Sequence, residues 1–239
     1  MTWSILARDD QGRFGVAIAS RFFAVGALCV HVQRGVGALS TQALMNPLYG
    51  PAGLALLAAG ESASDVIKTL TDADAGRAQR QLHVLPASGP AAAHTGSGCI
   101  DWCGHQMADD FSVAGNMLAG PQVIAATADA YVRTQGLPLA ERLLAAMVAG
   151  EAAGGDKRGK QAAALRIHGE QDYPELDLRV DDHEQPIIEL QRLYRKSLER
   201  YQPFILCLAG RDDPVGLTDR TEIEASIARF QAARSEQTR

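Results

Sequence analysis

The chain has 239 residues, enough to bury a substantial apolar core in one main domain. Hydrophobic residues make up 46%, charged residues 21% and aromatic residues 5%, a composition typical of globular rather than disordered proteins. The net charge of -5 comes from interspersed acids and bases, which excludes the charge signature of a nucleic-acid or anionic-membrane binder. We therefore expect a small-molecule or peptide-like substrate, with no nucleic acid and no membrane as partner.

The N-terminus lacks the basic start and apolar stretch of a signal peptide, and no window holds roughly 18 uninterrupted apolar residues. We expect a cytoplasmic protein.

The four cysteines are scattered, as is usual for buried reduced thiols. Cys99 and Cys103 could form a zinc cluster with His94 and His105, but C-x3-C with one histidine on each side is not a usual zinc pattern. No metal and no other cofactor is expected.

The first forty residues predict four strands in succession, because short apolar runs alternate with turns rich in glycine and aspartate. The strands span residues 2–8, 14–20, 27–33 and 36–42, and their close spacing implies an antiparallel meander. A helix beginning at Pro51 follows and ends near Gly60. Ser62 with Asp65 predicts the capped start of a second helix, through residue 70.

Runs of strands and helices continue to alternate in blocks. Strands are predicted at residues 81–86, 91–95, from 111, 161–168 and 176–180, with a loop at 96–110, and helices at 121–133, 138–149 and 185–200. The tail contains a polar helix at 220–233, so we divide the chain into domains 1–200 and 201–239. Segregated blocks predict an α+β fold of two antiparallel sheets enclosed by helices.

Thr2 carries the first chemical hypothesis. A small second residue normally allows removal of Met1, which leaves one threonine with both a hydroxyl and a free amine. An α-amino group titrates at about pH 8, so a fraction of it is available as a base at neutral pH. A small polar second residue is also commonplace, and by itself Thr2 does not distinguish a nucleophile from an ordinary strand residue.

Several longer motifs follow this opening. They are Gly-Val-Ala-Ile-Ala-Ser-Arg at 15–21, Ser-Thr-Gln at 40–42, Asn-Pro-Leu-Tyr-Gly at 46–50, Gly-Ser-Gly-Cys at 96–99, Gly-Asn-Met-Leu at 115–118, Gly-Gly-Asp-Lys-Arg-Gly-Lys-Gln at 154–161 and Asp-Leu-Arg-Val-Asp-Asp-His at 177–183. Together with Thr2 to Asp9 they resemble the DUF1028 family over roughly residues 1–195. Members of that family look like N-terminal nucleophile (Ntn) hydrolases. The resemblance implies the four-layer αββα sandwich of Ntn proteins, with Thr2 as nucleophile.

The first two strands also resemble the start of a proteasome β subunit, in which the second strand ends in Asp-Ser-Arg. Here the corresponding end is Ala19-Ser20-Arg21, so Ser20 and Arg21 match as catalytic candidates and the acidic residue is missing. His31 is the nearest candidate for the active-site lysine of that pattern. A core histidine is the other interpretation of this residue.

Polar residues at strand ends are candidates for the groups around the substrate. Thr41 and Asn116 could stabilise an oxyanion as catalytic residues, and Gln42 and Asn46 could bind substrate. Asparagine and glutamine in such positions also serve only to close turns.

The segment 154–161 is the most polar motif. Lys157 or Arg158 could hold a substrate carboxylate, or Asp156 could pair with one of them to fix the loop. The spacing does not match a phosphate-binding loop, so ATP is not expected. Asp181, Asp182 and His183 suit either an acid/base or metal site or the N-terminal cap of the last helix.

Two main functions remain open from the sequence, with a metal-dependent hydrolase as a third that would require bound metal. One is an amidohydrolase that acts on a small amide or peptide-like substrate through Thr2. The other is a non-catalytic ligand-binding or assembly protein that keeps the Ntn scaffold and recognises its ligand through residues 154–161. Ala-rich helices such as residues 137–149 are compatible with a homo-oligomer.

Overall fold

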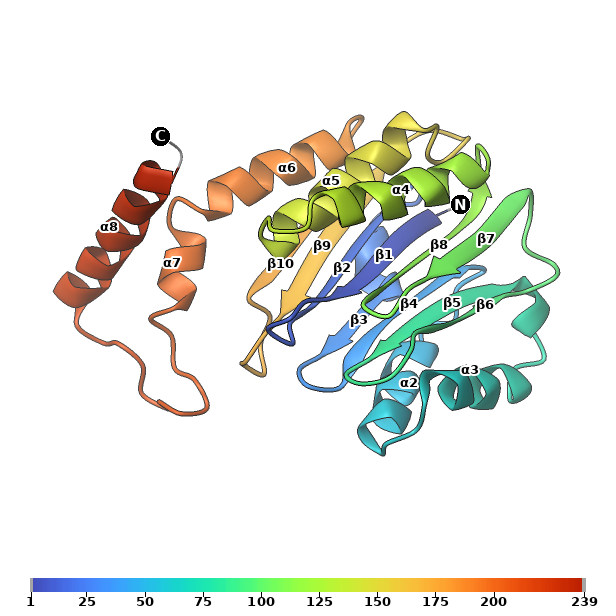
Figure 1. The fold of residues 1–239 in the computed structure, drawn as a ribbon, viewed down its shortest axis with the longest axis horizontal. Coiled ribbons are helices and arrows are strands. Elements are labelled where there is room, and N and C mark those ends of the chain that lie inside the picture. Colours follow the sequence, from blue (N-terminus) through green and yellow to red (C-terminus); the bar gives the residue numbers. More distant parts are fainter. Residues whose placement is uncertain (1, 238–239) are drawn as a thin grey trace. The chain divides into compact units, whose positions relative to one another are not determined.

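Two antiparallel β-sheets face each other in the computed structural model of the protein (Figure 1). The structure describes residues 2–237, which fall into two units, one ending at Leu190 and the other beginning at Gln191. The first unit holds both sheets. The six-stranded sheet has the order β10-β9-β2-β1-β8-β7 and the four-stranded sheet the order β3-β4-β5-β6. The prediction of an α+β fold with two antiparallel sheets is confirmed.

The strands of the larger sheet are β1 (Thr2–Arg8), β2 (Phe14–Ser20), β7 (Trp102–Met107), β8 (Phe111–Leu118), β9 (Ala162–His168) and β10 (Leu176–Val180). Those of the smaller sheet are β3 (Val30–Gln33), β4 (Gly37–Ala43), β5 (Arg80–Pro86) and β6 (Ala92–Thr95). Strand β1 pairs with β2 on one side and β8 on the other. The N-terminal strand therefore lies in the interior of the larger sheet.

Helices cover the outer face of each sheet (Figure 1). Helices α4 (Pro121–Arg133) and α5 (Leu139–Ala152) pack on the larger sheet, and α2 (Tyr49–Ala58) and α3 (Ala63–Asp72) pack on the smaller one. The predicted cap of α3 is present, since the Ser62 hydroxyl accepts the backbone N–H of Asp65 at 3.1 Å. The remaining helices are α1 (Val25–Cys29), the 3-10 turn η1 (Arg77–Gln79), α6 (Pro186–Ser197), α7 (Tyr201–Ile205) and α8 (Arg220–Gln237).

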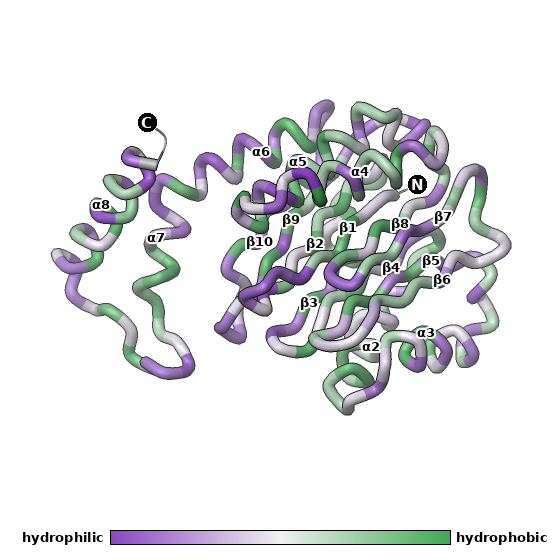
Figure 2. Tube along the Cα trace, viewed as in Figure 1, coloured by the Kyte–Doolittle hydropathy of each residue, from purple (hydrophilic) through white to green (hydrophobic). Residues whose placement is uncertain are grey.

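The core between the sheets is apolar at one end. Leu6 and Ile18 from the larger sheet pack with Ala38 and Leu85 from the smaller one. In Figure 2, many residues along the paired strands are hydrophobic, and many of those at the turns are hydrophilic. Burial of these side chains stabilises the contact between the two sheets.

The predicted strand at 27–33 is wrong in its first half. Ala24 adopts a left-handed conformation, with φ 53°, and the chain then forms α1. Gly26 of this helix packs so closely on β9 that a Cβ would lie 2.3 Å from that of Ala164. The short helix carries the chain from the larger to the smaller sheet, so the first four strands do not form one meander.

The predicted loop at 96–110 contains strand β7. This strand is the edge of the larger sheet, and its last three residues, His105, Gln106 and Met107, are exposed. The sequence analysis did not predict this strand, because an exposed edge strand carries no strict alternation of apolar and polar residues.

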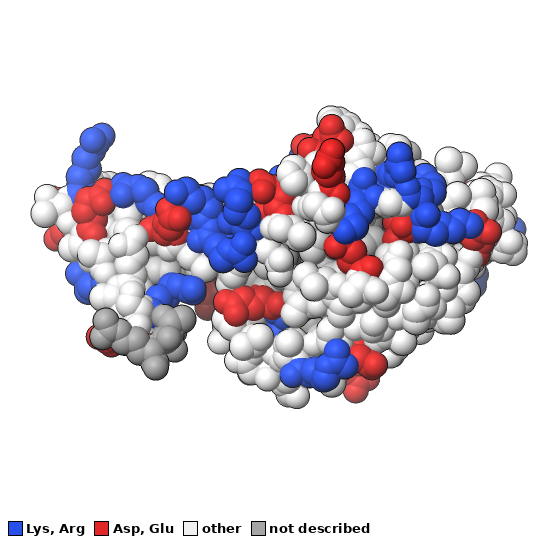
Figure 3. Space-filling view, turned by 90° about the horizontal axis from the view of Figure 1, so that it is seen from above, with Lys and Arg blue, Asp and Glu red and all other residues white. Residues whose placement is uncertain are grey.

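In the described residues, no helix is both long and apolar enough to cross a membrane. Acidic and basic side chains lie interspersed on the face shown in Figure 3.

Candidate active site

Thr2 begins β1 between two polar residues of the adjacent strands. It is paired with Ser20 on β2 and with Asn116 on β8. The Thr2 hydroxyl oxygen lies 3.0 Å from the Ser20 hydroxyl oxygen. All three residues are buried, with exposed fractions of 6%, 2% and 1%. The structure thus brings together three of the residues that the sequence proposed as catalytic.

The side chain of Thr2 faces the space between the sheets. Successive side chains of a strand point to opposite faces, so Thr2, Ser4 and Leu6 point the same way. Leu6 belongs to the core between the sheets. Trp3 points the other way, since its ring lies against the positions of Gly150 and Gly155 near the end of α5.

A buried polar network lies beside Thr2, and Gln81 of β5 is at its centre. The Gln81 side-chain nitrogen donates to the backbone carbonyls of Gly115, at 2.8 Å, and Gly104, at 3.1 Å. A carbonyl can only accept, so the orientation of the Gln81 amide is fixed. Its oxygen therefore accepts from the amide nitrogens of Gln42, at 2.8 Å, and Asn116, at 3.0 Å.

The protons further along the network are fixed in the same way. The oxygen of Gln42 faces Ser4, so the Ser4 hydroxyl donates to it at 2.8 Å. The Ser4 oxygen is then left to accept from Nε2 of His83 at 2.8 Å. Nδ1 of His83 accepts the Ser112 hydroxyl at 3.0 Å. Burial lowers the pKa of His83 to about 3, which keeps the ring neutral in this tautomer.

The network includes residues that the sequence analysis missed, namely Ser4, Gln81, His83 and Ser112. All four are fully buried. Ser4 shares a strand face with Thr2, and Ser112 shares one with Asn116. The sequence does place polar residues at alternate positions of otherwise apolar strands, which marks them as candidates for a buried network. It does not indicate which of them form hydrogen bonds between the two sheets.

Asp156 anchors the polar segment 154–161 to the end of β2. Its carboxylate accepts the backbone N–H groups of Arg21, at 3.0 Å, and Arg158, at 2.8 Å, and the Arg158 guanidinium at 3.2 Å. The side chain of Asp156 is 2% exposed. The buried carboxylate of Asp156 therefore contacts the backbone of Arg21, the residue that follows Ser20. Asp156 itself comes from a distant part of the chain and not from β2.

The charged side chains of this segment are paired. Lys157 forms an ion pair with Asp101, and Lys160 forms one with Glu151 at 3.0 Å. The Arg21 guanidinium donates to the backbone carbonyl of Arg158. A pocket of about 260 Å³ borders Ser20 and this segment, and Thr2 is not among the residues that line it.

Thr41, Asn46 and His31 are not brought to Thr2. Thr41 shares its strand face with Leu39, which packs against α2 and α3, and its hydroxyl accepts the backbone N–H of Asn46 at 3.2 Å. The Asn46 amide donates to Asp74 at 3.4 Å, outside the space between the sheets.

His31 lies against Gly50 of α2, where a Cβ added to the glycine would be 2.1 Å from Nδ1 of His31. Gln42 contacts Ser4, which shares the strand face of Thr2, but both ends of its amide are used within the network.

The segment 181–183 makes contacts typical of a turn that leads into a helix. Nδ1 of His183 accepts the backbone N–H of Gln185 at 2.9 Å, and Asp182 accepts the amide of Gln161 at 3.1 Å. Asp181 pairs with Arg179 at 2.7 Å. Within residues 2–237, no three His, Cys, Asp or Glu side chains are grouped so that they could hold a metal ion.

Comparison with known proteins identifies the family of the chain. The family model described as "Family of unknown function (DUF1028)" matches residues 2–190. The crystal structure of protein SPO2555 from Silicibacter pomeroyi, of the same family, has a TM-score of 0.85 and 32% identity, over 92% of this chain and 96% of that one. No curated protein matches the chain.

Two more distant solved structures are also similar. Anbu (ancestral beta-subunit) from Yersinia bercovieri has a TM-score of 0.43 and 12% identity, over 82% of this chain and 94% of that one. Anbu from Hyphomicrobium sp. strain MC1 has a TM-score of 0.39 and 10% identity, over 83% and 96%.

Proposed function

The chain belongs to the DUF1028 family, whose function is unknown, and we propose that it is an Ntn-type amidohydrolase acting on a small amide or peptide-like substrate through Thr2. One observation carries the proposal. The Thr2 hydroxyl lies at the start of an interior strand, 3.0 Å from the Ser20 hydroxyl, and Asn116 flanks it on the other side. Removal of Met1 would place a free amine on the same residue.

The arrangement of the layers supports the proposal. Helices α4 and α5, the larger sheet, the smaller sheet, and helices α2 and α3 follow one another (Figure 1). We infer from this order the four-layer αββα sandwich that the family resemblance implies. Catalysis at the start of an interior strand has the advantage that both neighbouring strands can contribute groups.

The proposed reaction begins with attack of the Thr2 oxygen on the amide carbonyl. The Thr2 amine takes the hydroxyl proton as the C–O bond forms and gives it to the leaving nitrogen as the C–N bond breaks. An ester of Thr2 results. Water, deprotonated by the same amine, then attacks the ester carbonyl, and the Thr2 oxygen leaves with the proton.

Ser20 and Asn116 have distinct roles in this scheme. The Ser20 hydroxyl is within hydrogen-bonding distance of the Thr2 oxygen and stabilises charge that develops on it. One Asn116 amide hydrogen is used by Gln81. The second is the donor that we assign to the oxyanion.

Asp156 and Gln81 act as positioning residues. Gln81 fixes which end of the Asn116 amide donates, because its own orientation is set by two backbone carbonyls. Asp156 holds the backbone directly after Ser20. Neither residue contacts the reacting atoms in this scheme.

The test uses the native protein without an N-terminal tag. Its intact mass is expected to show the loss of Met1. A peptide α,β-epoxyketone is the probe, because ring formation with it requires a hydroxyl and an amine on the same residue. We expect an adduct on the peptide that begins with Thr2.

Thr2→Val is the matched control, because valine has nearly the same shape and lacks only the hydroxyl. This variant should fold and give no adduct. Retention of Met1 in the native protein, or equal labelling of the variant, would overturn the proposal. A ligand-binding function of residues 154–161 would instead require Lys157→Ala to abolish binding with Thr2→Val silent, and the ion pairs in that segment do not favour it.

A further inference from the structure

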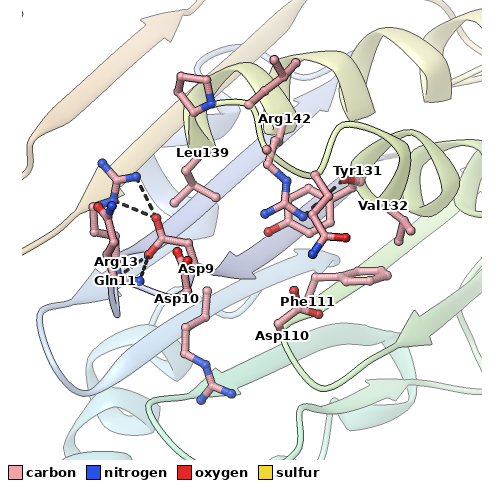
Figure 4. Close-up of a pocket in the computed structure, with 15 residues that line it drawn as sticks. Asp9, Asp10, Gln11, Arg13, Asp110, Phe111, Tyr131, Val132, Leu139 and Arg142 are labelled. Carbon is pink, nitrogen blue, oxygen red and sulfur yellow. Dashed lines mark hydrogen bonds and ion pairs between the residues drawn. The ribbon is translucent and has the colours of Figure 1, made fainter.

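A second cavity lies at the opposite end of β1, about 20 Å from Thr2 by the length of the strand. It has a volume of about 930 Å³ and lies where the β1–β2 turn faces the start of β8 and the helices α4 and α5 (Figure 4). None of the residues assigned to the proposed hydrolase site lines it.

Two residues that line this cavity each carry a buried donor without an acceptor. The Arg142 guanidinium carbon is 3.8 Å from the centre of the Tyr131 ring, and the Phe111 ring centre is 5.2 Å from that of Tyr131. Across residues 2–237, neither the Tyr131 hydroxyl nor Nε of Arg142 has a hydrogen-bond partner. Leaving buried donors without acceptors is costly, and a ligand with acceptor oxygens would satisfy them.

The chemical state of Tyr131 suits this role. Burial raises its pKa to about 12, so the hydroxyl keeps its proton and remains a donor at neutral pH. Figure 4 shows Tyr131 beside Arg142, with Phe111 and Asp110 on the side away from α5. A carboxylate fits such a pair, because its two oxygens match the planar guanidinium and can also accept the hydroxyl.

The other basic residues of the cavity are already engaged. The Arg8 guanidinium donates to the backbone carbonyls of Pro86, at 2.8 Å, and Asp109, at 3.1 Å. Arg13 pairs with Asp9 at 2.8 Å (Figure 4). Arg142 donates one hydrogen bond, to the backbone carbonyl of Tyr131 at 3.4 Å, and forms no ion pair among the described residues, so its charge is the one left to bind an anionic group.

The acidic residues at the rim indicate a second charge on the ligand. Asp10 and Asp110 line the cavity and are exposed, and neither forms an ion pair within the described part of the chain. These carboxylates would repel a phosphate or a dicarboxylate. They would attract a protonated amine.

We propose that this cavity binds an α-amino acid with an apolar side chain. The carboxylate of the ligand accepts from Arg142 and Tyr131, and its ammonium group faces Asp10 and Asp110. The side chain packs on Phe111, Val132 and Leu139, which supply the apolar part of the wall.

Binding is measured by calorimetry on the full chain with three ligands that share a branched carbon skeleton and differ in their charged groups. L-Leucine carries both charges, 4-methylpentanoate lacks the amine, and 3-methylbutylamine lacks the carboxylate. We expect leucine to bind with a Kd of about 1 mM or tighter, and each single-charge analogue to bind at least about tenfold more weakly. Equal binding of leucine and 4-methylpentanoate would overturn the proposal. So would failure of leucine, valine, methionine and phenylalanine all to bind at about 10 mM.

Two variants test the contacts. Tyr131→Phe removes a hydroxyl without a partner, so we expect an unchanged or higher melting temperature and leucine binding weakened by about tenfold. Arg142→Gln should abolish measurable binding. Arg133→Gln, an exposed position of α4 outside the cavity, is the matched control and should bind like the native protein. Native affinity in either Tyr131→Phe or Arg142→Gln would refute the site, whatever the outcome at Thr2.

Discussion

The carboxylate of Asp156 accepts the backbone N–H of Arg21 at 3.0 Å, although the two residues are 135 positions apart in the chain. Two further donors from Arg158 complete its contacts. This single buried side chain ties the segment 154–161 to the end of the strand that carries Ser20.

Replacing Asp156 by asparagine should therefore destabilise the protein. An amide keeps the size of the side chain but loses the charge and turns one acceptor into a donor facing an N–H group. We expect a decrease of about 2–3 kcal/mol in the free energy of unfolding, measured in urea. Asp72→Asn is the control, because Asp72 forms an exposed pair with Lys68, and it should have no measurable effect. Equal stability of the two variants would contradict the anchoring role.

Ser4 and Ser40 provide a matched pair of buried serines. Both are fully buried, but Ser4 has hydrogen bonds to Gln42 and His83, whereas the Ser40 hydroxyl has no partner among the described residues. Ser4→Ala should cost about 1–3 kcal/mol of stability, because it leaves buried partners unsatisfied. Ser40→Ala should be neutral or stabilising. Equal losses in the two variants would show that the network contributes nothing specific.

His83 should make the stability depend on pH. Its pKa is about 3 in the folded protein and about 6.5 in the unfolded chain, so between these values only the unfolded state binds the proton. Stability should thus fall as the pH is lowered from about 6.5 towards 3, by up to about 1.4 kcal/mol per pH unit. His83→Gln should show a shallower fall. In NMR spectra the native His83 ring should stay in the Nε2–H form throughout, and titration of this ring near 6.5 would contradict the assignment.

Under the proposed function, Asn116 and Ser20 should affect the reaction of Thr2 with the epoxyketone to different degrees. Asn116→Ala removes an oxyanion donor, and the rate of adduct formation with the epoxyketone should fall by about 100-fold or more. Ser20→Ala should reduce it by a smaller factor, about tenfold, because the Thr2 amine remains as the base. The rates are measured by mass spectrometry of the adduct, with the melting temperature as the check on folding. Rates equal to the native rate in both variants would remove these residues from the mechanism.

Most elements could be predicted from local patterns. The bounds of β1, β2, β10 and α4 agree with the sequence analysis, because each is an apolar run bounded by clear turn or proline signals. Pairing between strands distant in the chain, such as Ser20 with Ala162, leaves no local signal. The change of sheet at α1 depends on the close approach of Gly26 to Ala164, which is a tertiary contact.

The candidate site was predictable only where it lies on β1 and its direct neighbours. The predicted residues Thr2, Ser20 and Asn116 lie together, whereas Thr41 faces α2 and α3 and Asn46 follows β4 and contacts Asp74. Gln81 and His83 come from β5, whose relation to β1 depends on how the two sheets stack. The acid of the Asp-Ser-Arg pattern is absent at position 19, and the buried acid that contacts the end of β2, Asp156, comes from a segment far along the chain.

The interior position of β1 also has a practical consequence for how the protein is produced. A purification tag fused ahead of Thr2 would convert its amine into an amide and extend the backbone past Ser20 and Asn116 on either side. Under the proposed mechanism such a preparation is inert for a trivial reason. Screening for substrates calls for a tag at the far end of the chain, or for a leader that a protease removes cleanly before Thr2.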